Sequence, residues 1–512
     1  MPLDWTALIV FVLLFGFVTW LGFIAAKWRA GDLDLLHEWG LGGRRFGTLV
    51  AWFLIGGDLY TAYTFIAVPA LMYGAGALGF FAVPYTIMVY PILYIVFPRL
   101  WSVAHKHGFV TSADFVRGRF GNRWLALAVS FTGILATMPY IALQLVGIEV
   151  VIGAMGVETN GFIGDLPLII SFVILAAFTY TSGLRAPAMI AIVKDVLIYI
   201  TVIAAVVAVP MKLGGYGAVF NAIPQPKLLL APPVTGSMGA YSAYATLALG
   251  SAFALFLYPH SITGILSSSS ARVVRRNAAI LPAYSLLLGL LALMGFMAVA
   301  IGVSNMPEFK SGFAEFKANF SVPALFMAMF PSWFVGVAFS AIAIGALVPA
   351  AIMSIATANT FTRNIYKEFI NPIATGRQES QMAKYVSLVI KAGALAFIFF
   401  VPLQYALWLQ LLGGVWISQT APAVVLGLYT RFLNGWALLI GWVCGFGLGT
   451  YLVVLNNWAP VYPLALPGLT FPCYIALIAL VVNLVVSFVL SPVFNAVASD
   501  RARDVTVVAD YT

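Results

Sequence analysis

Long apolar segments separated by short polar stretches make up nearly the whole chain. A helix needs about 20 apolar residues to cross roughly 30 Å of hydrocarbon, and about thirteen segments come close to that length or exceed it. They are residues 5–26, 48–73, 79–100, 124–155, 166–180, 187–211, 241–265, 280–303, 325–362, 385–401, 411–429, 436–455 and 469–490. The pattern predicts an all-α polytopic membrane protein with about thirteen transmembrane helices.

The connections between the predicted helices are short. The longest lie near residues 212–240 and 304–324 and from 491 onward, and each holds only a few tens of residues. Only 8% of the residues are charged, against about 25% in an ordinary soluble domain. We therefore expect no separate soluble domain, and we expect any function to lie within or close to the membrane.

The 26 Lys and Arg residues give a net charge of +9, and their positions indicate which side of the membrane each connection faces. If the N-terminus lies outside, most of them fall in cytoplasmic connections, as the positive-inside rule requires. This asymmetry predicts a multi-pass protein of a bacterial cytoplasmic membrane with a cytoplasmic C-terminus. The lipid bilayer, and not nucleic acid, is the expected partner of the basic residues.

Two predicted helices contain residues that interrupt a helix. The interrupting residues are Gly56, Gly57 and Asp58 in segment 48–73, and Gly250, Pro259 and His260 in segment 241–265. These segments are five apart in order, so they cross the membrane in opposite directions. Inverted repeats with broken helices, whose free carbonyls and helix ends bind substrate and ion near the midplane, have this signature. The pattern favours a secondary transporter.

Several stretches carry a resemblance to a known family. "GGRRFG" precedes the second segment, "TSADFVRGRFGN" follows the third and "YTSGLRAPAMIAIVKD" enters the sixth. "FTRNIYKEF" ends the ninth segment, and "QTAPAVVLGLYTRFLNGWALLIG" crosses the eleventh and twelfth. In this order the chain resembles the sodium/solute symporter family from about residue 40 to 450. "YPHSITGILSSSSARVVRRNAA" is similar to the monocarboxylate permease branch, which imports lactate, pyruvate and related short acids.

The resemblance implies a leucine-transporter-type fold with a five-plus-five inverted repeat. In this division, residues 1–46 form a first transmembrane helix and a cytoplasmic loop, and residues 47–211 form the first repeat. Residues 212–429 form the second repeat, and residues 430–512 form two further helices and a cytoplasmic tail. The family works by alternating access, and we expect a monomer to be sufficient for transport.

The expected function is the import of a short-chain monocarboxylate such as lactate or pyruvate. A sodium-coupled symporter of another solute, such as proline, pantothenate or a sugar, is the alternative within the fold. A membrane sensor is the alternative of another class, although the tail is short for a signalling module. No motif such as G-x-S-x-G or H-E-x-x-H indicates an enzyme. We expect no cofactor and no metal site, only a coupling ion, H⁺ or Na⁺.

The resemblance also implies a substrate site. The positions that face the pocket in relatives correspond to Gly57, Tyr60, Thr61, Tyr63, Tyr140, Gln144, Ser251, Phe253 and Tyr258. Backbone N–H groups at the ends of broken helices are suited to a carboxylate. For any one aromatic residue, packing in the core is an equal alternative.

The implied ion site departs from the family pattern. In sodium-coupled relatives two adjacent hydroxyl residues of the ninth segment bind the ion, but the matching positions here are Val348 and Pro349. Lys194 stands where the family commonly has a small hydroxyl residue. We predict that the Lys194 ammonium substitutes for sodium and reaches the backbone carbonyls around Gly56 and Leu59, which makes transport proton-coupled or at least sodium-independent.

Three alternatives to this hypothesis remain. Lys194 could instead snorkel to the headgroups. Because Pro349 frees the carbonyl of Gly345, that oxygen could ligate sodium. A shift of the alignment would bring Ser354 or Thr357 into the site.

The other charged or titratable residues in predicted spans have their own expectations. Asp195 is expected to act electrostatically beside the ion site, with a partner different from that of Lys194, because adjacent helical residues do not face each other. Asp58 either orients the first break or shares a proton there, or it caps a helix end. His260 either carries a proton or donates to a freed carbonyl. Lys391 is expected to snorkel.

Overall fold

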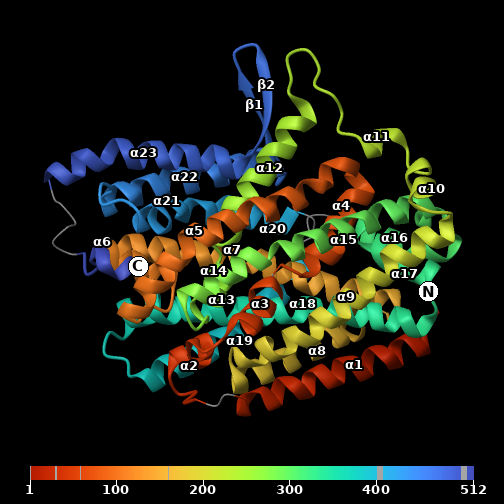
Figure 1. The fold of residues 1–512 in the computed structure, drawn as a ribbon, viewed down its shortest axis with the longest axis horizontal. Helices are drawn as coiled ribbons and strands as arrows, with labels where there is room; N and C mark the ends of the chain where they lie inside the picture. The colour runs from red at the N-terminus through yellow and green to blue at the C-terminus, as the bar shows by residue number, and fades with distance from the viewer. Residues whose placement is uncertain (1, 29–30, 58, 159–160, 401–407, 498–503) are drawn as a thin grey trace.

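The computed structural model describes residues 2–28, 31–57, 59–158, 161–400, 408–497 and 504–512, which form a bundle of helices (Figure 1). The long helices are α1 (Trp5–Ile24), α5 (Ala82–His107), α7 (Arg123–Ala154), α8 (Gly161–Ser182), α9 (Arg185–Leu213), α15 (Pro282–Ile301), α18 (Ser332–Phe361), α19 (Gly376–Phe400), α22 (Gly435–Leu455) and α23 (Ile475–Val497). The short helices are α2 (Leu36–Leu41), α6 (Ser112–Phe120), α10 (Tyr216–Asn221), α11 (Gln225–Leu228), α14 (Ala271–Ile280), α16 (Lys310–Phe316), α17 (Ser321–Met329), α20 (Leu409–Ile417) and α21 (Ala421–Val424).

Helix α18 lies at the centre of the bundle. It packs against α7, α1, α9 and α19, and most of its side chains are buried. Small residues recur along it, and small residues let neighbouring helices approach closely. A Cβ atom added at Gly336 would lie 2.5 Å from the backbone oxygen of Ala7 in α1. The central helix is thus fixed by close backbone contact as well as by apolar burial.

Both predicted broken helices are present. The first consists of α3 (Thr48–Gly57), a π-helical turn η3 (Tyr63–Ala67) and α4 (Val68–Ala75). The second consists of α12 (Gly239–Leu255) and α13 (Pro259–Leu266), which meet at a bend of 50°. Proline at the first position of α13 suits a helix start, where its missing N–H is not needed. The two breaks therefore confirm the prediction that segments 48–73 and 241–265 are interrupted helices.

By length and composition, fewer helices of the structure qualify as membrane spans than the thirteen that the sequence pattern predicts. Among the described residues, nine helices are long and apolar enough to cross a membrane, and the bent pair α12–α13 makes a tenth. Each predicted segment overlaps at least one helix. The count of thirteen, and the division of the chain into two repeats, stay predictions.

A hairpin replaces the start of the last predicted span. Strands β1 (Val461–Leu466) and β2 (Leu469–Tyr474) pair antiparallel and project beyond the helices at the top of Figure 1, so the helix begins only at Ile475. The turn between the strands contains Pro467 followed by Gly468, whose φ is +72°. Proline followed by a glycine with positive φ suits a type II turn. The apolar content of residues 469–474 concealed this hairpin.

Gly250 does not interrupt its helix, contrary to the prediction. Helix α12 runs through it, and the break falls between Leu255 and Pro259. A Cβ atom at Gly250 would lie 2.4 Å from the ring of Tyr474, the last residue of β2. On the other side, a Cβ atom at Gly414 of α20 would lie 2.3 Å from the hydroxyl of Tyr474. The two glycines form a slot for this ring.

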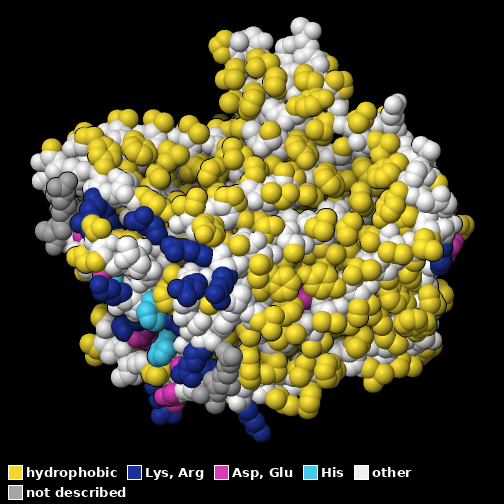
Figure 2. Space-filling model, viewed as in Figure 1, with side chains coloured by type: hydrophobic (Ala, Val, Ile, Leu, Met, Phe, Trp, Pro, Cys, Tyr) yellow, Lys and Arg dark blue, Asp and Glu magenta, His cyan; other side chains and the backbone are white. Residues whose placement is uncertain are grey.

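Basic side chains gather at one end of the molecule. Figure 2 shows Lys and Arg over the end that carries α6 and the C-terminus, while most of the remaining surface in this view is apolar. The C-terminal residues 504–512 bind to this end through ion pairs. Asp504 pairs with Arg119 of α6 at 2.9 Å, and Asp510 pairs with Lys106 and His107 at the end of α5, at 2.5 and 2.7 Å.

The environment of Asp510 controls its protonation. Burial raises the pKa of its carboxyl group, but hydrogen bonds from Lys106, from the Val507 N–H and from His107 outweigh this effect and hold the pKa well below its ordinary value. A carboxyl group with a lowered pKa stabilises the bound state above its ordinary pKa of about 3.9, and this contribution is lost as the pH falls through the lowered pKa. At neutral pH the contribution is therefore fully present.

We predict that Asp510→Asn, which removes the negative charge, loosens the binding of residues 504–512 at pH 7. Hydrogen–deuterium exchange of this segment should become faster in the variant, because the asparagine cannot pair with Lys106. Asp34→Asn, which changes an exposed carboxylate elsewhere, should leave the exchange of the segment unchanged. Equal exchange in wild type and Asp510→Asn would contradict the assigned role of the ion pair.

Candidate functional site

A buried lysine meets the first broken helix inside the bundle. The Nζ atom of Lys194, on α9, donates to the carbonyl oxygens of Gly57 at 2.7 Å and of Tyr60 at 3.3 Å. These carbonyls flank the break, where the regular helix no longer supplies donors for them. The contacts fall on Gly57 and Tyr60, one residue beyond each of the carbonyls named in the prediction, Gly56 and Leu59. The Lys194 side chain is 0% exposed and does not snorkel.

Asp195 completes the group around the ammonium. Its Oδ1 atom lies 3.0 Å from Lys194 Nζ, and both side chains are fully buried. The expectation of separate partners is therefore wrong, because the flexible lysine stem lets Nζ reach the neighbouring carboxylate. The Oδ2 atom accepts a hydrogen bond from the Tyr284 hydroxyl of α15 at 2.6 Å. Sequence reasoning missed Tyr284, which lies in no recognisable motif.

Two adjacent glycines make room for this group. A Cβ atom at Gly57 would lie 2.9 Å from Lys194 Nζ, and one at Gly56 would lie 2.4 Å from the ring of Tyr284. The Tyr60 hydroxyl donates to the backbone oxygen of Tyr284 at 3.0 Å. The glycines that interrupt the helix thus also admit the two partners of Asp195, and Tyr60, predicted as a substrate residue, belongs to this group.

Val348 and Pro349 of α18, the positions without a hydroxyl group, lie at about the same level along the bundle as Lys194 of α9. Helices α9 and α18 run in opposite directions, as their contacts with the two ends of α1 show. Gly345 faces Ile198, since a Cβ atom there would lie 3.7 Å from the Ile198 side chain. One helical turn from Ile198 leads to Lys194 on α9, and one turn from Gly345 in the same direction leads to Val348 and Pro349. All of these residues are buried.

The first broken helix resumes with its N–H groups already occupied. The Ala62 N–H donates to Oε1 of Gln144 on α7 at 2.9 Å, and the Tyr63 N–H donates to Oγ1 of Thr61 at 3.0 Å. The Thr61 N–H donates to the hydroxyl of Thr64 at 2.9 Å. Gln144 and Thr61, predicted as substrate residues, cap this helix end. The Gln144 oxygen holds the place that a carboxylate oxygen would take on the Ala62 N–H.

Aromatic residues surround the second break. The rings of Tyr140, Tyr258 and His260 lie between 5.2 and 5.6 Å from one another, and all three are buried. The hydroxyls of Tyr258 and Tyr474 donate to the neighbouring backbone oxygens of Gln410 and Leu411. Gln144, which accepts from Ala62 at the first break, lies one helical turn from Tyr140 on α7 and donates to its backbone oxygen. Residues from the first break, the second break, α7 and the hairpin therefore converge in one region. Tyr474 is a member that the sequence did not suggest.

Polar groups suited to an anion are present in the two broken helices. The hydroxyls of Tyr63 and Ser251 are buried and have no hydrogen-bond partner among the residues that the structure describes. A buried polar group left without a partner costs about 1–3 kcal/mol. The N-cap residue of α13, Tyr258, provides no side-chain cap for this helix, and helix N-termini favour anions. These groups gain from an acceptor that the protein itself does not provide.

Two predicted positions are wrong, and one lies outside the described residues. Phe253 is 41% exposed on the outer face of α12, so it does not line the substrate region. Lys391 is buried and its Nζ atom donates to the Ser387 hydroxyl at 2.6 Å, so it does not snorkel. Whether these two side chains are exposed or buried depends on which face of the helix packs against neighbouring helices, and the sequence alone does not identify that face. Asp58 is not among the residues that the structure describes.

Two broken helices that meet beside a buried ionisable group define a secondary transporter. A model of the sodium:solute symporter family matches residues 39–445. The chain belongs to the sodium:solute symporter family, and is a multi-pass membrane transporter rather than an enzyme.

Individual proteins extend the comparison. A protein of Rhizobium johnstonii named monocarboxylate transport permease protein is 52% identical over 508 residues, which is 98% of this chain and 99% of that protein. The uncharacterized symporter YodF of Bacillus subtilis is 32% identical over 89% of both chains. A solved Na⁺-coupled sialic acid symporter, in a substrate-bound outward-open state, superimposes with a TM-score of 0.75 over 96% of this chain and 98% of its own, at 15% identity. This likeness confirms the predicted fold class.

We predict that Lys194→Met destabilises the protein by about 3–5 kcal/mol, because it leaves the buried Asp195 carboxylate without its cation. The double variant Lys194→Met with Asp195→Asn should regain part of this loss. Thermal unfolding of the purified protein in detergent measures both. Lys391→Met is the control, since Lys391 contacts no carboxylate among the described residues. A double variant that loses the sum of the two single losses would contradict the pairing.

Proposed function

We propose that this protein imports a short-chain monocarboxylate by alternating access, and that transport is coupled to protons with Lys194 in the place of a sodium ion. The observation that carries the proposal is the contact of the Lys194 ammonium with the Gly57 and Tyr60 carbonyls and with Asp195. The near-identical length and 52% identity of the Rhizobium permease support the choice of substrate class.

The Lys194 ammonium is surrounded by oxygen atoms in the way that a bound monovalent cation would be. The described residues place at least three oxygen atoms within 3.3 Å of Nζ, two from backbone carbonyls and one from a carboxylate. Oxygen ligands of this kind suit a hard cation. A sodium ion at the same position would be repelled by the lysine charge at close range. Val348 and Pro349, near the same level, have no hydroxyl to offer a displaced ion.

A change of protonation at this site would act directly on the broken helix. When Lys194 loses its proton, the neutral amine no longer attracts the Gly57 and Tyr60 carbonyls as a cation does. Asp195 then loses the stabilising charge of Lys194 and keeps the hydrogen bond from Tyr284. Burial disfavours a charge without a partner. Release of the proton toward the cytoplasm would therefore loosen the contact between α9 and the first break, which is the contact that alternating access has to change.

The substrate carboxylate would bind where polar groups still need an acceptor. The hydroxyls of Tyr63 and Ser251 offer donors, the N-terminus of α13 offers a positive helix end, and the tyrosine rings offer an apolar wall for a short carbon chain. A carboxylate oxygen could also replace the Gln144 oxygen on the Ala62 N–H. In this proposal Gln144 holds the first broken helix in its present form until the substrate arrives.

Uptake of labelled lactate into proteoliposomes tests the coupling. We expect an inward pH gradient alone to drive accumulation, and an inward sodium gradient alone to have no effect. Lys194→Met should abolish the response to the pH gradient, because the variant lacks the ammonium group that carries the proton in this proposal. Lys391→Met, which alters the other buried lysine, should keep that response.

Two results of this assay would overturn the proposed proton coupling, and a third would overturn the proposed substrate class. Accumulation driven by sodium alone would show that a sodium site exists, and the freed carbonyl of Gly345 would then be the first ligand to examine. A wild-type protein that exchanges lactate without responding to either gradient would exclude coupled transport. If labelled lactate is not taken up, and neither are labelled pyruvate or propionate, the proposed substrate class is excluded. That result does not bear on the coupling ion.

Substitutions of the two unpartnered hydroxyls test the carboxylate site. Tyr63→Phe and Ser251→Ala should each raise the KM for lactate by about tenfold or more, because a hydrogen bond to a charged group is worth about 1.5–3 kcal/mol. Ser340→Ala is the control, since that hydroxyl donates to Gly336 O on its own helix. An unchanged KM in both variants would place the carboxylate elsewhere.

A further inference from the structure

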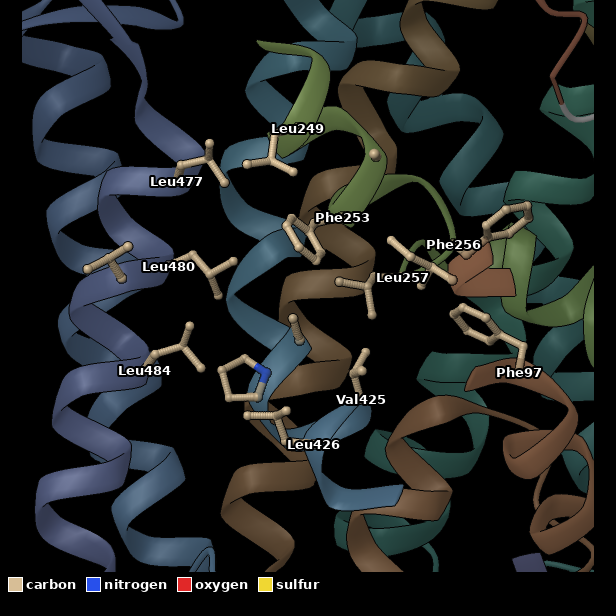
Figure 3. A pocket seen from close by; sticks show the side chains of 15 residues that line it. Phe97, Leu249, Phe253, Phe256, Leu257, Val425, Leu426, Leu477, Leu480 and Leu484 are labelled. Carbon is tan, nitrogen blue, oxygen red and sulfur yellow. The ribbon is translucent and has the colours of Figure 1, made fainter. Parts of the chain in front are cut away.

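An apolar groove opens on the outside of the bundle. It encloses about 370 Å³ between α5, α12, α21 and α23, and its lining residues are all apolar. Figure 3 shows Leu249 and Phe253 of α12 opposite Leu477, Leu480 and Leu484 of α23, with their side chains directed into the same space. Pro422 of α21 and Val425, the residue after this helix, form the floor.

The groove belongs to the surface that faces the membrane. Leu249, Phe253 and Val481 on its rim are 43%, 41% and 58% exposed. Such side chains lie on helices that cross the bilayer, so the medium around the groove is hydrocarbon. A flexible chain of methylene groups fits a narrow groove of this kind. Because lipid tails are as apolar as the lining residues, the gain comes from van der Waals contact that a void would lack.

A cation lies near the predicted cytoplasmic end of the groove. The guanidinium of Arg99 on α5 lies 4.6 Å from the centre of the Tyr429 ring and 5.9 Å from that of Tyr511. Tyr429 follows the lining residue Val425 by four positions, so it connects Arg99 to this end of the groove. The Tyr429 hydroxyl donates to the backbone oxygen of Ile95 at 2.9 Å, which ties the segment after α21 to α5. The Arg99 Nε atom is buried without a hydrogen-bond partner among the described residues. Basic pockets between helices on the cytoplasmic side suit anionic lipid headgroups.

We propose that this groove is a binding site for one acyl chain of an anionic membrane phospholipid, whose headgroup interacts with Arg99. The acyl chain runs from the level of Phe97 and Leu426 toward Leu249 and Leu477. The apolar lining selects the hydrocarbon chain, and the arginine selects the charge of the headgroup. A neutral phospholipid fills the groove but lacks the second interaction.

The site also touches the second broken helix. Phe256 and Leu257 line the groove and belong to the unwound residues between α12 and α13. The next residue, Tyr258, packs with Tyr140 and His260 in the candidate substrate region. A bound acyl chain therefore supports the break from the membrane side, and its presence affects the same residues that alternating access must move.

Native mass spectrometry of the full-length protein, titrated in detergent with phosphatidylglycerol or with phosphatidylcholine of the same acyl chains, tests the site. Wild type should bind one phosphatidylglycerol about fivefold more tightly than phosphatidylcholine, and Arg99→Gln should remove this preference. Ala421→Phe, which fills the groove, should weaken the binding of both lipids. If that variant does not fold, Val481→Trp at the exposed rim replaces it.

Matched variants separate the site from general effects of the membrane. Ala177→Phe makes the same change on the exposed face of α8, and Arg275→Gln removes an exposed arginine of α14. Neither should alter lipid binding. The proposal is overturned if Ala421→Phe and Ala177→Phe act alike, if wild type binds both lipids equally, or if only detergent remains bound.

Discussion

The contact between the Lys194 ammonium and the carbonyls of the first broken helix is the interaction on which the rest of the site depends. A helix that stops inside a membrane leaves carbonyl oxygens without donors, and in hydrocarbon each such group costs several kcal/mol. A buried ammonium is also unfavourable alone, at about 2.5–3.5 kcal/mol on insertion scales. When the ammonium lies against these carbonyls and Asp195, the cost of the carbonyls without donors and the cost of the buried charge offset each other. The break in the helix and the lysine charge therefore depend on one another.

Tyr284 extends this interaction to a third helix. Its hydroxyl binds Asp195 on α9, and its backbone oxygen accepts from Tyr60 at the break. A change in the charge of Lys194 therefore alters the interactions that connect α3, α9 and α15. Cooperative hydrogen bonding of this kind in a medium of low dielectric makes a partly satisfied network costly, which favours a small number of discrete arrangements over gradual movement.

The second broken helix is held from two sides. On the outer side, the hairpin places Tyr474 in the slot between Gly250 and Gly414, where its hydroxyl binds the backbone of Leu411 on α20. On the membrane side, Phe256 and Leu257 face the apolar groove. The substrate region lies between these supports, so its shape depends on residues that are far apart in the sequence and that contact no substrate themselves.

Local chemistry allowed the sequence alone to determine the membrane class, the helical fold and the two breaks, because apolar length, glycine and proline act on neighbouring residues. It also marked Lys194 and the missing hydroxyls at Val348 and Pro349. Only the tertiary structure decided that Lys194 pairs with Asp195, that Phe253 faces outward, that Gly250 receives Tyr474, and that Tyr284 joins the ion pair. Each of these depends on which surfaces of distant helices meet, and helix packing is set by the shapes of all the partners together rather than by any one stretch of the chain.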